Sequence, residues 1–116
     1  MGGVSGVSGA SRSDGDRAAM KAAVKASLAR LVEVAPGRSV EVRVPPYAVV
    51  QAVPGTTHRR GTPPAIVETD AATWLALAEG SLAWADAVAD GAVRASGERS
   101  DLSPYLPLPP SDETDP

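Results

Sequence analysis

Residues 74–98 read WLALAEGSLAWADAVADGAVRASGE, a stretch in which glycines separate short apolar segments. Thr69 or Asp70 can cap a helix over residues 71–79, because a side-chain oxygen at that position accepts from free backbone N–H groups. Gly80 fits the left-handed position that commonly ends a helix. The first segment is therefore predicted to be a short helix whose Trp and Leu side chains are available for burial.

The second half of the stretch predicts another short helix and a strand. Ser81 opens this helix and Gly91 closes it, and residues 92–96 follow as a strand that Gly97 stops. A final turn or strand is predicted from the leucines that come after it, Leu102, Leu106 and Leu108.

Valines that alternate with charged residues predict a strand upstream of this stretch. Residues 39–44 (SVEVRV) have one apolar face and one wet face in an extended conformation. Residues 47–53 predict a second strand that is more apolar on both faces, and residues 65–69 predict a short third one. The simplest arrangement joins the first two strands in a hairpin across Pro45-Pro46.

A longer helix is predicted ahead of the strands, from about Asp16 to Val34. Its apolar stripe recurs at helical spacing and consists of Met20, Val24, Leu28 and Leu31. Pro36-Gly37 stops it. The order is therefore helix, three strands, two short helices and a strand, which favours an α+β fold over alternating βαβ units.

The chain has 116 residues, enough for one domain but not two. We assign the domain to residues 15–108. The Gly- and Ser-rich residues 1–14 are expected to form an unstructured lead, and the acidic, proline-rich residues 109–116 an unstructured tail.

Composition and motifs exclude several classes of function. The sequence has no Cys, and its single His cannot form a zinc site without Cys or well-spaced carboxylates. The net charge of −3 argues against a nucleic-acid partner. The sequence has no G-x-S-x-G elbow and no glycine-rich phosphate loop, so we expect neither enzymatic activity nor a cofactor. It also has no signal segment and no apolar run of about 20 residues, so we expect a cytoplasmic protein.

Three segments resemble a known family. Residues 74–98 resemble the end of the sterol carrier protein domain, the SCP-2-like family. The positions that carry this resemblance are Gly80, Gly91, Gly97 and the small Ala87. Residues 39–53 (SVEVRVPPYAVVQAV) and 58–70 (HRRGTPPAIVETD) are similar to the actinobacterial branch of the family, and the resemblance covers roughly residues 38–108.

The resemblance implies a twisted, mainly antiparallel or mixed sheet of about four to five strands, with helices packed on one face. It also implies an apolar tunnel between sheet and helices in which members bind lipids, fatty acyl chains or sterols without a cofactor. The implied partner is therefore a hydrophobic small molecule or lipid, with transient contact to a membrane surface.

A ligand in such a tunnel is expected to lie between the sheet and the two short helices. Its predicted wall consists of Trp74, Leu77, Leu82, Trp84 and Val88. Its predicted floor consists of Val40, Val42, Val49 or Val50, of which we select Val42 and Val49 as site residues. Arg59 or Arg60 would hold a polar head group.

Two alternatives remain open from the sequence. Because the chain is rich in Ala and Val and has no Phe, both Trp side chains can be core anchors in an interaction module with a closed core. A tunnel smaller than roughly a few hundred Å³ would favour that alternative. A similar domain also occurs at the C-terminus of maleylpyruvate isomerase-type proteins, so the chain can be an accessory module.

Overall fold

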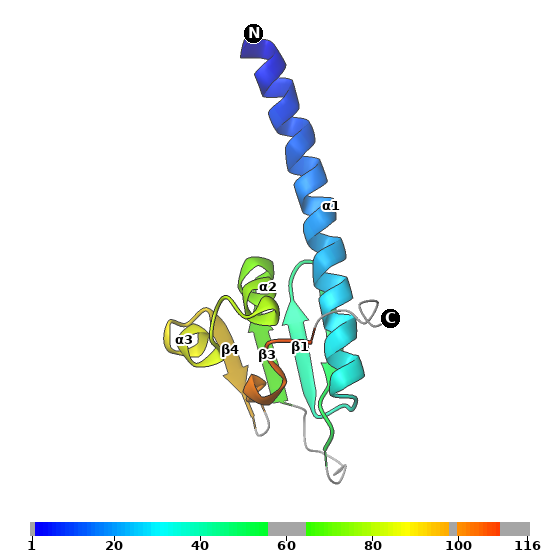
Figure 1. Ribbon diagram of the computed structural model, residues 1–116, viewed down its shortest axis with the longest axis vertical. Helices are drawn as coiled ribbons and strands as arrows, with labels where there is room; N and C mark the ends of the chain where they lie inside the picture. The colour runs from blue at the N-terminus through cyan, green and yellow to red at the C-terminus, as the bar shows by residue number, and fades with distance from the viewer. Residues whose placement is uncertain (1, 56–64, 98–99, 110–116) are drawn as a thin grey trace.

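A computed structural model describes residues 2–55, 65–97 and 100–109, except for the side chains of residues 2–13. It contains a long helix, a four-stranded sheet, two short helices and a 3₁₀ turn in the predicted order (Figure 1). The elements are α1 (Gly2–Val34), β1 (Val40–Val44), β2 (Ala48–Ala52), β3 (Ala65–Thr69), α2 (Ala71–Glu79), α3 (Trp84–Ala89), β4 (Val93–Ser96) and η1 (Ser103–Tyr105). The predicted α+β class is confirmed.

The sheet is mixed, with strand order β2-β1-β3-β4. β1 pairs antiparallel with β2 and parallel with β3, and β3 pairs antiparallel with β4. The predicted hairpin of β1 and β2 is confirmed, and the Tyr47 N–H donates to the Val44 carbonyl over 2.9 Å across its turn. Pro45 and Pro46 stand in the turn itself, where their missing N–H groups remove no bond from the ladder.

The two faces of the sheet differ in chemistry. One face packs against α1 and α2, and its buried residues in β1 and β3 are Val40, Val42, Val44, Ala65, Val67 and Thr69. The opposite face carries charge: Arg43 Nε donates to the Glu41 carboxylate over 2.6 Å, and Arg43 Nη1 lies 3.9 Å from Glu68 Oε1. The alternation of Val with Glu and Arg thus produces the half-buried strand that it predicts.

Helix α1 packs on the sheet through the predicted apolar stripe. Val24, Leu28 and Leu31 have no exposed surface, and Met20 is partly buried against them. The helix extends further toward the N-terminus than the predicted start at Asp16, and its N-terminal part projects beyond the rest of the domain (Figure 1). The division into lead, domain and tail stays a prediction. Among the described residues, no helix combines the length and apolar character that a bilayer span requires.

The boundaries of the two short helices follow from their capping hydrogen bonds. Asp70 Oδ1 accepts from the Thr73 N–H over 2.8 Å, and Gly80 takes the predicted left-handed conformation with φ of +92°. Helix α3 begins at Trp84, later than the predicted Ser81. The reason is that the N–H groups of residues 81 and 82 both donate to the Ala76 carbonyl and extend the end of α2.

Trp74 joins the two helices that cover the sheet. Its side chain is completely buried, and its indole Nε1–H donates to Ser27 Oγ of α1 over 2.8 Å. The Ser27 hydroxyl in turn donates to the Val24 carbonyl over 3.0 Å. A buried indole N–H needs an acceptor, so this pair fixes α2 at one position along α1.

Replacing Ser27 tests this connection. Ser27→Ala leaves the buried indole N–H without its acceptor, and we expect it to lower the free energy of unfolding by about 1–3 kcal/mol. Denaturant unfolding followed by Trp fluorescence measures this change. The exposed Ser81 is the control, and Ser81→Ala is expected to stay within about 0.5 kcal/mol of the parent. Equal losses in the two variants would contradict the proposed link.

Candidate functional site

The predicted wall residues lie in two different environments. Trp74 and Leu77 belong to the closed core. Leu82 and Trp84 are only partly buried at its edge, and Val88 is 41% exposed on α3. The Trp74 indole N–H is already bonded to Ser27, which leaves it unavailable to a ligand head group.

The expectation that Val42 and Val49 form one floor is corrected by the sheet register. Val42 pairs with Val50, whereas Val49 pairs with Arg43. Because successive side chains of a strand point to opposite faces, Val42 is fully buried and Val49 is 58% exposed on the charged face. Val40 and Val50 lie on the same face as Val42. The predicted head-group residues Arg59 and Arg60 lie outside the described residues.

The layer between the sheet and the helices is closely packed. Nine described residues of this core have no accessible surface: Val24, Leu28, Leu31, Val40, Val42, Val44, Ala52, Trp74 and Leu102. A side chain without accessible surface touches neither solvent nor a void large enough for a water molecule. At these residues the layer has no opening of the kind that a ligand between sheet and helices requires.

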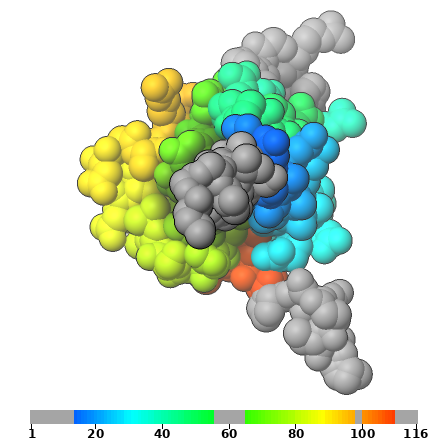
Figure 2. Space-filling model, turned by 90° about the horizontal axis from the view of Figure 1, so that it is seen from above, coloured from blue at the N-terminus to red at the C-terminus, as the bar shows by residue number. Residues whose placement is uncertain are grey.

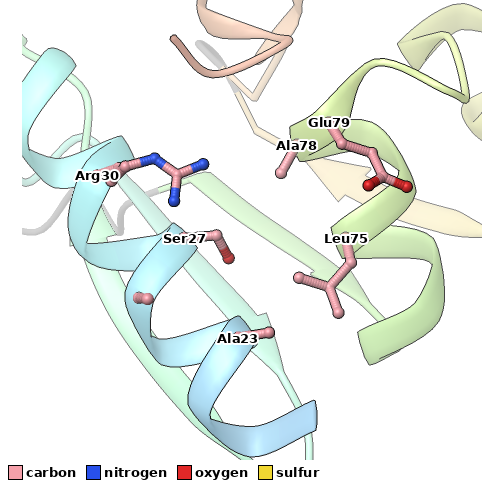
Figure 3. A pocket seen from close by; sticks show the side chains of 7 residues that line it. Ala23, Ser27, Arg30, Leu75, Ala78 and Glu79 are labelled. Carbon is pink, nitrogen blue, oxygen red and sulfur yellow. The ribbon is translucent and has the colours of Figure 1, made fainter. Parts of the chain in front are cut away.

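A groove of about 290 Å³ lies instead between α1 and α2 (Figure 3). Seen along α1 from above, α2 and α3 lie to one side of that helix (Figure 2). The groove is lined by Ala23, Ala26, Ser27, Arg30, Leu75, Ala78 and Glu79. Its space arises because alanines occupy positions where larger side chains would fill the gap between the helices. Its volume is close to the lower end of the roughly 300–1,000 Å³ that is typical of ligand pockets.

Two charged side chains lie at one end of this groove. Arg30 and Glu79 approach it from α1 and α2, on either side of Ala78 (Figure 3). Arg30 Nε is buried and has no hydrogen-bond partner among the described residues, and these residues show no ion pair between Arg30 and Glu79. Glu79 is exposed and accepts a hydrogen bond from Ser81 Oγ over 3.2 Å. The groove therefore has small side chains along its walls and, at one end, an arginine without a carboxylate partner among the described residues.

Sequence reasoning missed this groove because it considered only the apolar stripe of α1. Arg30 lies off that stripe. A second pattern was available: Ala23, Ala26, Ser27 and Arg30 are spaced three, one and three apart, which places three small residues and one cation on one helix face. Only the position of α2 shows that this face is covered by another helix.

The arrangement is that of a small α+β domain with two helices on one sheet face and an apolar groove between them. Residues 16–108 match the family model described as bacterial SCP ortholog, SCP being the sterol carrier protein. The chain belongs to this bacterial sterol carrier protein-like family, which confirms the resemblance noted in the sequence. Membership suggests binding of hydrophobic ligands in general. No curated protein matches the sequence.

Variants of two valines test which face of the sheet is buried. Val42→Ala removes a fully buried side chain and is expected to cost about 2 kcal/mol of unfolding free energy, from lost apolar burial and the cavity left behind. Val49→Ala is the matched control on the open face, with an expected change of about 0.5 kcal/mol or less. Chemical denaturation of both variants measures the difference, and a larger loss for Val49 would reverse the assignment.

Proposed function

We propose that this protein is a non-catalytic carrier that binds a hydrophobic ligand in the groove between α1 and α2. We expect the ligand to be a lipid, a fatty acyl chain, or a sterol or isoprenoid. The observation that carries the proposal is the alanine-lined space between two helices that are otherwise tightly joined by Trp74 and Ser27. This groove lies beside a core whose fully buried side chains leave no room for a ligand.

Burial of apolar ligand surface would supply the binding energy of such a carrier. Each 100 Å² of apolar ligand surface removed from water contributes about 2.5 kcal/mol. The groove lies at the protein surface between the helices, so a bound ligand keeps part of its own surface exposed. A partly exposed ligand can leave without unfolding of the core, as transfer requires.

Release to a lipid bilayer would need transient contact between the protein and the membrane surface. We include this contact in the proposal because the ligands in question partition into membranes. The basic residues His58, Arg59 and Arg60 lie outside the described residues.

A second candidate function is an interaction or accessory module with a closed core, related to the C-terminal domain of maleylpyruvate isomerase-type proteins. The complete burial of Leu28, Val42 and Trp74 favours it, because a filled core needs no ligand for stability. Native mass spectrometry separates the two candidates. A bound mass that extracts into solvent supports the carrier, whereas a bare mass that stays unchanged with acyl chains and sterols supports the module.

Filling the groove tests the site itself. Ala26 is exposed and lines the groove, so Ala26→Leu places a larger side chain in the space without disturbing the core. We expect this variant to bind the neutral fluorescent probe phenylnaphthylamine about ten-fold more weakly than the parent, with little change in Tm.

The matched control is Ala29→Leu, since Ala29 is exposed on the same helix outside the groove. Its probe affinity is expected to equal that of the parent in the same titration. Equal affinities of the Ala26 and Ala29 variants would place the probe elsewhere and count against the groove as the binding site.

A further inference from the structure

We propose that backbone strain at Val53 makes the junction between α1 and the sheet open locally, and that this opening sets the rate at which a ligand enters and leaves the groove. The junction is formed by Ala35, Ser39 and Val53. Its role in ligand exchange rests on the proposed carrier function, whereas its local opening does not.

Val53 has an unfavourable backbone conformation. Its φ is +77°, and it is the only residue other than glycine with a positive φ in the part of the chain that the structure describes. A left-handed conformation is disfavoured for any residue with a Cβ, and most strongly for a β-branched residue such as valine. The folded protein therefore carries a conformational cost at Val53 that a glycine in the same place would not have.

The surroundings of Val53 hold it in this conformation. Its N–H donates to the Ala35 carbonyl just after α1 over 2.6 Å, and its carbonyl accepts from the Ser39 N–H just ahead of β1 over 3.1 Å. Its side chain is buried in the core. A Cβ at Gly37 would collide with the Val53 carbonyl, so the loop between α1 and β1 can pass this close only because residue 37 is a glycine. Val53 thus fastens the end of α1 to the sheet.

The strain lowers the free energy needed to open this junction. When the two hydrogen bonds break, Val53 can return to a negative φ, so the strain is present in the closed junction and absent from the open one. An open junction is therefore populated about ten-fold more than it would be with an unstrained residue at position 53, within the range that such strain produces.

The junction lies near one end of the groove. Helix α1 supplies one wall of the groove, and the bond between Ser27 and Trp74 holds its middle against α2. The bond between Ala35 and Val53 holds its end against the sheet. Arg30 lies between these two points and lines the groove about 8 Å from Ala35 along the helix axis. Opening of the junction frees the last turns of α1 to move away from α2 and widens the groove at this end.

Paired variants of Val53 test the strain. Val53→Gly and Val53→Ala both remove the valine side chain, but only glycine accepts a left-handed conformation without cost. We therefore expect Val53→Gly to have a Tm about 5 °C higher than Val53→Ala. The matched control is Val50 in the middle of β2, where the backbone is extended and Val50→Gly should melt below Val50→Ala. A lower Tm for Val53→Gly than for Val53→Ala would overturn the strain.

Amide hydrogen exchange of the full chain, measured by NMR without any ligand, tests the local opening. The Ser39 N–H reports the junction, and the Leu28 N–H in the buried part of α1 reports unfolding of the whole domain. In the parent protein we expect the protection factor of Ser39 to be at least ten-fold lower than that of Leu28. Equal protection of the two amides would overturn the local opening, because the junction would then open only when the domain unfolds.

Stopped-flow fluorescence with phenylnaphthylamine tests the role in ligand exchange. Because an opening step controls both directions alike, Val53→Gly should bind and release the probe about ten-fold more slowly than Val53→Ala, with an equal Kd. Equal rates in the two variants would overturn the role in ligand exchange while the carrier function stands. Failure of the probe to bind the parent would overturn the carrier function and, with it, this role. The amide exchange of Ser39 and Leu28 decides on the local opening in either case.

Discussion

The hydrogen bond from the Trp74 indole to the Ser27 hydroxyl is the contact on which the helical layer depends. The chain has no Phe, and Trp74 is the largest of its fully buried side chains. It fills much of the space between α1, α2 and the sheet, and its N–H can be buried only because Ser27 accepts it. Ser27 also lines the groove, so the contact that closes the core fixes the distance between the groove's two walls.

Much of the fold could be predicted because its patterns are local. The alternation in residues 39–44 defines a strand with two unlike faces. The Asp70 side chain caps the first turn of α2, and Gly80 ends the helix in a left-handed conformation. The sheet face on which Val49 lies was harder to predict. A strand that is apolar on both faces does not indicate its register, and a shift of one residue exchanges the buried and exposed sets.

The site was harder to predict than the fold because it depends on how helices meet. Trp74 and Leu77 were correctly selected as buried, yet burial alone does not distinguish a core anchor from a tunnel wall. The neighbouring residues distinguish these two roles. The Ser27 hydroxyl accepts the hydrogen bond of the Trp74 indole, and buried valines and leucines pack around both side chains. Arg30 was missed for the same reason, since its environment is created by α2, which lies far along the chain.

NMR tests most directly whether the ligand binds in the groove between α1 and α2. The full chain is labelled on backbone amides and valine methyl groups and titrated with decanoate. Binding in the groove between α1 and α2 would shift the amide signals of Ala23 to Arg30 and of Leu75 to Glu79. The methyl signals of Val42 and Val67, which are buried beneath the helices, would stay unchanged. Large shifts of those valine methyls, with little change at Ala26 and Arg30, would show that the ligand enters between sheet and helices and would exclude the groove as the binding site.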